Sequence, residues 1–169
     1  MNMEINPSEY KILIVDDVMS NVLLLKVLLT NEKFAIATAN NGRQALEQVD
    51  KERPDLLLLD VMMPDLSGFE VAQRLKSNPD TADIPIIFLT ALNSTTDIVK
   101  GFQAGASDFI SKPFNKEELI IRVTHQISLV AAKRIILNKT EELQRIIAGR
   151  DKLYSVIAHD LRSPMGSIK

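Results

Sequence analysis

The chain has 169 residues, a formal net charge of −2 and no cysteine. This length allows one ordinary domain plus an extension, and 46% hydrophobic with 25% charged residues is the composition of a soluble globular protein. The absence of cysteine excludes a disulfide framework and a thiolate metal site. No signal-peptide pattern opens the sequence, and no apolar run reaches the roughly 20 residues of a membrane span. We therefore expect a cytoplasmic protein with no membrane span.

Charge is distributed unevenly along the chain. Residues 1–132 contain 12 Lys/Arg and 18 Asp/Glu, whereas residues 133–169 contain 8 Lys/Arg and 4 Asp/Glu. This contrast predicts two regions of different character. The basic charges of the second region are spread around a helical pattern without interleaved aromatic residues, so a solvated helix face is favoured over direct nucleic-acid binding.

Short apolar runs alternate with amphipathic stretches in the first 125 residues. The apolar runs, interpreted as strands, are residues 11–15, 34–39, 55–59, 84–90 and 107–111. Helical periodicity occupies the segments between them, at residues 20–31, 42–52, 68–77 and 95–104. Capping-box patterns open two helices, with Ser67 and Glu70 in one and Asn115 and Glu118 in the other. Strict alternation of strand and helix predicts a doubly wound α/β domain with a five-stranded parallel sheet.

A long helical pattern follows Asn115 and continues to about residue 158. Its apolar seam has one charged member, Arg134, and a break in phase after residue 137. The seam residues are Ile120, Val123, Ile127, Val130, Arg134 and Leu137, then Leu143, Ile146, Arg150, Leu153 and Ile157. Heptad spacing predicts a parallel homodimeric coiled coil through residues 120–157. The alternative is a helix that folds back on its own domain.

Reactive side chains follow four of the expected strands, where an open parallel sheet binds its ligands. They are Asp16 and Asp17 after the first strand, Asp60 after the third, Thr90 after the fourth and Lys112 after the fifth. One such Asp can simply be the N-cap of the next helix. Three carboxylates crowded together repel unless a cation lies among them. A hard divalent ion with oxygen ligands fits this set, and we expect Mg²⁺.

These residues lie in motifs that resemble the receiver domain of two-component response regulators. The motifs ILIVDD, LLLLDVMMPDLSGFE, IIFLTA and GASDFISKPF occur in that family's order and at about its spacing, within residues 10–125. The resemblance implies a flavodoxin-like sheet with strand order 2-1-3-4-5 and a receiver domain over residues 1–125. It also implies a partner that carries phosphohistidine, either a kinase or a phosphotransfer protein.

The resemblance gives Asp60 the role of phosphoacceptor, whose carboxylate takes the phosphoryl group as an acyl phosphate. Asp16 and Asp17 would bind Mg²⁺ together with Asp60, and the backbone carbonyl of Met62 would add a ligand. Lys112 would stabilise charge on the phosphoryl oxygens.

The same resemblance implies a switch. Thr90 would reposition to hydrogen-bond the bound phosphoryl group, and Phe109 would turn inward when Thr90 moves. Phe109 has no hydroxyl group, so any signal that it transmits must be one of packing. The resemblance also implies a cis peptide bond between Lys112 and Pro113.

The segment AHDLRSPMGSI, near the end of the sequence, resembles the H-box of sensor histidine kinases. The resemblance makes His159 a second phosphoacceptor and Asp160 the acid that assists proton transfer. It divides the remaining chain into a coiled-coil stalk at residues 126–153 and the start of a kinase dimerisation helix at 154–169. An ordinary solvent-facing histidine is the alternative. Ser163 departs from the Thr or Asn usually associated with phosphatase activity.

These features predict a fragment of a receiver–histidine kinase hybrid, because neither the second helix of the kinase hairpin nor an ATP-binding domain is present in the sequence. The receiver would control the kinase module through the helical stalk. The alternative is a stand-alone response regulator whose coiled coil dimerises or recruits partners. An aspartate-nucleophile phosphatase is disfavoured, because such enzymes carry Asp-x-Asp after the first strand and the pair here is Asp16-Asp17.

Overall fold

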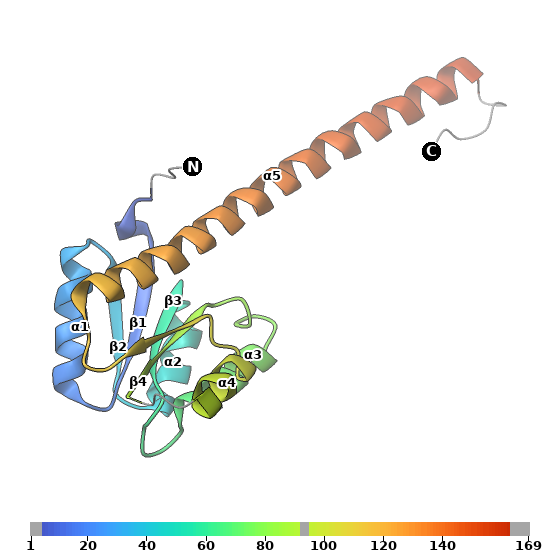
Figure 1. Ribbon diagram of the computed structural model, residues 1–169. Helices are drawn as coiled ribbons and strands as arrows, with labels where there is room; N and C mark the ends of the chain where they lie inside the picture. The colour runs from blue at the N-terminus through green and yellow to red at the C-terminus, as the bar shows by residue number, and fades with distance from the viewer. Residues whose placement is uncertain (1–4, 92–94, 163–169) are drawn as a thin grey trace. The chain divides into compact units, whose positions relative to one another are not determined.

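The structure is a computed structural model that describes the backbone of residues 5–91 and 95–162 and the side chains of residues 5–91 and 98–148. Strands and helices alternate (Figure 1). The strands are β1 (Lys11–Val15), β2 (Ala35–Ala39), β3 (Leu56–Asp60), β4 (Ile86–Thr90) and β5 (Asp108–Ser111). The helices are η1 (Pro7–Glu9, 3-10), α1 (Met19–Asn31), α2 (Gly42–Glu52), α3 (Gly68–Ser77), α4 (Thr95–Gln103) and α5 (Lys116–Arg162).

The five strands form one parallel sheet in the order β2-β1-β3-β4-β5. This confirms the predicted flavodoxin-like fold. Every residue of β3 and β4 is buried, as expected for central parallel strands covered on both faces. The order reverses direction between β1 and β3, so the carboxyl ends of these strands flank the position where such sheets bind ligands.

Successive side chains along each strand point to opposite faces of the sheet and pack into two different layers. Leu13, Leu57 and Phe88 belong to a core cluster that also contains buried residues of α2 and α3. The intervening strand residues point to the opposite face, where α1 and the first turns of α5 lie (Figure 1). Those helices bury an apolar stripe each: Val22, Leu25 and Leu29 in α1, and Leu119, Val123 and Ile127 in α5.

The sequence predicted most helix and strand boundaries to within one or two residues of those in the structure. Helices α2 and α3 begin and end at the expected positions, and their N-caps Asn41 and Ser67 accept hydrogen bonds from the backbone N–H of Gln44 and Glu70. The expected strand 84–90 begins only at Ile86, because a proline precedes it and lacks the N–H needed for the ladder. The Lys112–Pro113 peptide bond is cis, as the resemblance implied.

Helix α5 belongs to two compact units of the chain, one ending at Val130 and the other beginning at Ala131. The first unit therefore includes five residues more than the expected receiver boundary at residue 125. Arg122 ties this part of α5 to the edge strand β5 through two hydrogen bonds to Asp108, at 2.8 and 2.9 Å. Within the described residues, no helix combines the length and apolar character that crossing a membrane requires.

Two isoleucines of α5 test how strongly this helix contributes to the first unit. Ile127 is fully buried, whereas Ile121 is 68% exposed. We expect Ile127→Ala to lower the free energy of unfolding by about 2–4 kcal/mol, because it removes buried methyl groups and leaves a cavity. Ile121→Ala should change it by less than about 0.5 kcal/mol. Urea denaturation of both variants measures the difference, and equal effects would contradict the assignment of this helix face to the core.

Candidate functional site: a carboxylate cluster at the edge of the sheet

The sequence-predicted site residues converge at the carboxyl edge of the sheet. Asp60 and Thr90 are the last residues of β3 and β4, and Asp16 and Lys112 follow β1 and β5 directly. Carboxylate oxygens of Asp16, Asp17 and Asp60 all lie within 4.8 Å of one another. Asp16 and Asp60 are buried, whereas Asp17 is exposed. The structure thus brings three acidic groups and one ammonium into a single cluster, open on the side of Asp17.

Asp16 is held in place by the start of α1. Its Oδ1 accepts a hydrogen bond from the backbone N–H of Val18 at 2.9 Å, and its Oδ2 accepts one from the Asn21 side chain at 3.2 Å. These donors partly replace the water that a buried carboxylate loses. Sequence reasoning did not identify Asn21. The available signal was its place in the first turn of a helix that directly follows two aspartates.

Lys112 connects the two buried carboxylates. Its Nζ lies 3.1 Å from Asp60 Oδ1 and 3.3 Å from Asp16 Oδ2. Burial lowers the pKa of Lys112, but the hydrogen bond and charge of Asp60, with those of Asp16, outweigh this effect and leave the pKa above its ordinary value. Lys112 therefore carries a positive charge directly between Asp16 and Asp60.

Asp60 is the most strongly perturbed carboxyl group among the described residues. Burial and the nearby charge of Asp16 raise the pKa of Asp60 to about 6, against the opposing effects of the Lys112 ammonium and the backbone N–H of Met62. That N–H donates to Asp60 Oδ1 at 3.3 Å. The carboxylate is thus poorly solvated but still mostly ionised at neutral pH, a state suited to a nucleophile.

Gly68 allows the third helix to begin directly behind Asp60. A Cβ at this position would lie 2.3 Å from the carbonyl oxygen of Asp60 and 2.9 Å from Val61 Cα, both backbone atoms. The Gly68 N–H donates to Val61 O at 2.9 Å. A side chain at this position would therefore displace the backbone that carries Asp60.

Thr90 lies beside the cluster in the neighbouring strand. It is buried, and its carbonyl oxygen accepts a hydrogen bond from the backbone N–H of Lys112 at 2.9 Å. In the β3–β4 register Asp60 pairs with Leu89, one residue before Thr90. This position would allow the Thr90 hydroxyl group to contact a group bound to Asp60.

Phe109 lies in an aromatic row. Its ring centroid is 5.7 Å from that of Phe88 and 5.0 Å from that of Phe102 on α4. It also contacts α4 at Gly101, where a Cβ would lie only 2.2 Å from the Phe109 ring. Phe109 is half-buried. It packs against two aromatic rings and against Gly101, so it can act on its neighbours only through packing.

The donor set fits a hard divalent cation. Three carboxylates against one ammonium leave an excess of negative charge, and oxygen atoms from two buried groups and one exposed group approach one another closely. Such oxygen-rich sets are typical of Mg²⁺ or Ca²⁺ sites. The side chain of Met62 is exposed and offers no oxygen atom to this set.

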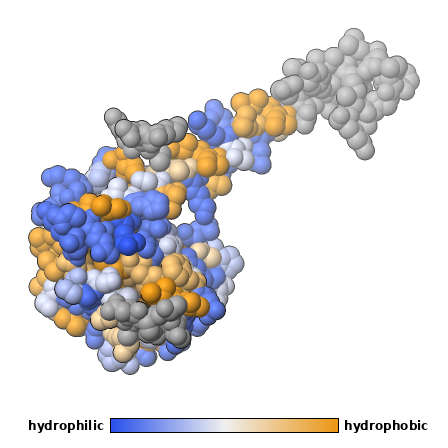
Figure 2. Space-filling model, in the orientation of Figure 1, coloured by the Kyte–Doolittle hydropathy of each residue, from blue (hydrophilic) through white to orange (hydrophobic). Residues whose placement is uncertain are grey.

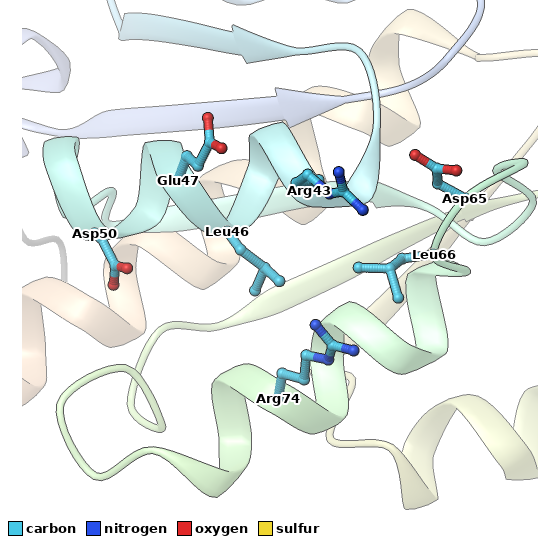
Figure 3. A pocket seen from close by; sticks show the side chains of 7 residues that line it. All are labelled: Arg43, Leu46, Glu47, Asp50, Asp65, Leu66 and Arg74. Carbon is cyan, nitrogen blue, oxygen red and sulfur yellow. The ribbon is translucent and has the colours of Figure 1, made fainter.

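A separate cavity of about 310 Å³ lies between α2, α3 and the loop before α3 (Figure 3). It contains none of the carboxylate-cluster residues, and its charged side chains are all exposed. Figure 3 shows acidic and basic groups interspersed around two leucines. Its lining residues are Arg43, Leu46, Glu47, Asp50, Asp65, Leu66 and Arg74. This mixture does not indicate one class of ligand.

The proposed second phosphoacceptor, His159, and its neighbour Asp160 lie outside the residues whose side chains the structure describes. The helical backbone of α5 includes both positions. Residues 163–169, the rest of the H-box pattern, lie outside the described residues altogether. Their assigned roles remain predictions.

The doubly wound sheet thus carries an acidic cluster and a lysine at its carboxyl edge, where such sheets bind their ligands. The chain belongs to the response regulator receiver domain family, whose model matches residues 12–124. This confirms the resemblance seen in the sequence over the first unit.

Curated relatives extend the comparison. Response regulator PleD of Caulobacter vibrioides is 42% identical over 140 residues, which are 83% of this chain and 30% of PleD. The DNA-binding response regulator MtrA of Mycobacterium leprae is 42% identical over 113 residues, or 67% of this chain and 49% of MtrA. The chain thus spans between about a third and a half of the length of these relatives.

Solved structures show the same fold. The signal receiver domain of a signal transduction histidine kinase from Syntrophus aciditrophicus is 36% identical, with a TM-score of 0.66 over 70% of this chain and 90% of that one. The chemotaxis protein CheY4 of Vibrio cholerae is 32% identical, with a TM-score of 0.66 over 69% of this chain and 97% of that one.

The raised pKa of Asp60 predicts a pH dependence of stability in metal-free buffer. Between the ordinary pKa of about 4 and the folded value of about 6, the folded state retains a proton that the unfolded chain releases, so stability falls as the pH rises through this window. Asp60→Asn should lack this loss and be more stable than the wild type above pH 6, by about 1–3 kcal/mol. Urea midpoints at pH 4 to 7 measure the difference, and a difference that is independent of pH would contradict the prediction.

Proposed function

We propose that the chain is a two-component signalling module that receives a phosphoryl group on Asp60. The phosphodonor is a phosphohistidine on a kinase or a phosphotransfer protein. The observation that carries the proposal is the convergence of Asp60, Asp16 and Lys112 at one edge of a receiver-family sheet.

The transfer is a displacement at phosphorus. An Asp60 oxygen forms a bond to phosphorus while the N–P bond to the donor histidine breaks, and the bonding electrons return to the imidazole nitrogen. The product is an acyl phosphate on Asp60. Poor solvation of the Asp60 carboxylate favours attack, because little water must be removed from it before the reaction.

Asp16, Asp17 and Asp60 would hold Mg²⁺, with a further ligand from the Met62 carbonyl. When bound, Mg²⁺ supplies positive charge that offsets the negative charge of the phosphoryl oxygens. Asp16 also orients the Lys112 ammonium, because the two are in contact at 3.3 Å. After transfer, Lys112 can exchange its contact with the Asp60 carboxylate for one with a phosphoryl oxygen.

The signal would pass from the cluster to α5 through the edge strand β5. Thr90 would bind the phosphoryl group, and Phe109 would repack against Phe88 and Phe102. Asp108 precedes Phe109, and its carboxylate accepts hydrogen bonds from both the Phe109 N–H at 2.8 Å and the Arg122 guanidinium of α5. A shift of Phe109 therefore reaches α5 through the Asp108 carboxylate.

The output would be control of a histidine-kinase module at His159, through a parallel homodimer of the helical stalk over residues 120–157. The receiver of a histidine kinase is among the similar structures, which supports this candidate. A stand-alone response regulator is the second candidate, and PleD and MtrA, both named response regulators, favour it. MtrA is named as DNA-binding; our sequence interpretation for this chain is that it makes no direct contact with nucleic acid.

Labelling with acetyl phosphate and Mg²⁺ tests the phosphoacceptor. We expect Asp60→Asn to abolish incorporation of the phosphoryl group, because an amide oxygen is a poor nucleophile toward phosphorus. Asp65→Asn, an exposed acid in the loop after β3, is the matched control and should be labelled like the wild type. Intact-mass spectrometry counts the phosphoryl groups, and wild-type labelling of Asp60→Asn would remove Asp60 from this role.

Lys112→Ala tests the ammonium. We expect phosphorylation to slow by roughly 10- to 100-fold, because a charged donor to the phosphoryl oxygens is lost, while Mg²⁺ binding measured by calorimetry persists. Lys116→Ala removes an exposed lysine at the start of α5 and should leave the rate unchanged. A wild-type rate in Lys112→Ala would show that the ammonium does not act on the transfer.

A further inference from the structure

Asn21 connects helix α1 to the carboxylate cluster. It is half-buried in the first turn of the helix, and its side-chain amide donates a hydrogen bond to Asp16 Oδ2 at 3.2 Å. The outward positions of α1 are apolar instead: Met19, Leu23 and Val27 are each more than half exposed, and Figure 2 shows apolar surface on the side where Figure 1 places α1. A polar side chain that turns inward from such a helix indicates a specific partner.

The side chain of Asn21 is not needed to form the helix. The N-cap of α1 is Val18, which makes no side-chain capping bond, and the backbone N–H of Asn21 donates to the Val18 carbonyl oxygen at 3.0 Å. The first turn is thus closed by its backbone. Asparagine is also a poorer helix former than alanine. The hydrogen bond from the Asn21 amide therefore serves the carboxylate cluster and not the helix.

Three donors divide the two oxygen atoms of Asp16 between them. Oδ2 accepts from the Asn21 amide and lies 3.3 Å from Lys112 Nζ, whereas Oδ1 accepts from the backbone N–H of Val18 at 2.9 Å. Each carboxylate oxygen offers about two acceptor positions. Among the described residues, Oδ2 is therefore fully used and Oδ1 keeps one position open. Because the Asp16 side chain is buried, these donors fix its rotation in place of water.

Asn21 orients Asp16 without adding a charge. A lysine or arginine could donate to the same oxygen, but it would offset one more of the three carboxylates that face the Lys112 ammonium. The amide is neutral, and the start of α1 adds only the partial positive charge of a helix N-terminus. The cluster thereby keeps the excess negative charge that binding of a divalent cation requires.

We propose that Asn21 is a positioning residue for cation binding at the cluster. It fixes the rotation of the Asp16 carboxylate, so that Oδ2 stays with Lys112 and the open position of Oδ1 is kept for the cation. This rests on the proposed function, in which Asp16 helps to hold Mg²⁺. Without the amide, Asp16 can rotate, and its orientation must be fixed during binding at a cost in affinity. Hydrogen bonds to metal ligands typically contribute about 10- to 100-fold in metal affinity or activity.

Calorimetric titration of the full chain with Mg²⁺ tests this role. We expect Asn21→Ala to weaken Mg²⁺ binding by about 10-fold. Asn21→Leu keeps a side chain of similar size without a donor and should show the same loss. Both replacements favour the helix more than asparagine does, so unfolding of α1 does not account for a loss. Ser20→Ala changes the exposed neighbour in the same turn and is the control with unchanged affinity.

Wild-type affinity in either Asn21 variant overturns the proposal, because the missing donor is common to both. The titration involves no phosphoryl group, so it is independent of Asp60 labelling. If the wild type is labelled and its Mg²⁺ affinity does not depend on Asn21, only the positioning role fails. If Mg²⁺ affinity depends on Asn21 but the wild type is not labelled by acetyl phosphate, only the phosphoacceptor role of Asp60 fails.

The rate of labelling by acetyl phosphate at increasing Mg²⁺ concentration supplies a second test. Asp16 gains a further partner when the cation is bound, so the amide matters less once the site is filled. We expect Asn21→Ala to need about 10-fold more Mg²⁺ for its half-maximal rate, with a maximal rate within about threefold of the wild type. A lower maximal rate at an unchanged Mg²⁺ requirement would place Asn21 in the transfer itself and overturn the proposal.

Discussion

The Lys112 ammonium lies between two buried carboxylates, and the carboxyl edge of the sheet depends on this contact. Asp16 and Asp60 come from different strands, and without a cation their mutual repulsion would push them apart or protonate one of them. The Lys112 ammonium lies 3.3 Å from the Asp16 carboxylate and 3.1 Å from the Asp60 carboxylate. Its single positive charge does not neutralise both negative charges. The cluster therefore keeps a net negative charge, and it can bind a cation or an electrophile on the side where Asp17 is exposed.

The sequence predicted the fold and most of the cluster because both depend on local rules. Alternating apolar runs and caps such as Ser67 define the elements, and the carboxyl ends of parallel strands must share an edge. The contacts that fix side-chain orientation were not predictable in this way. The bonds from Asn21 to Asp16 and from Arg122 to Asp108 join residues whose relation appears only when helices and strands are packed.

The seam of α5 shows a different limit of sequence reasoning. Heptad spacing reports that a stripe is apolar, but it does not report what covers the stripe. Val123 and Ile127 fit a coiled-coil pattern, and the structure buries both against the receiver sheet instead. At these two positions, the apolar pattern expected for a partner helix belongs instead to the core of the first unit.

Strand β5 links the cluster to the part of α5 that belongs to the first unit. It has only four residues and forms the edge of the sheet, so it is held by one neighbouring strand and by its side chains. At one end Lys112 contacts Asp60, and at the other Asp108 binds Arg122 of α5. A phosphoryl group that draws Lys112 away from Asp60 would act directly on the chain segment that anchors α5.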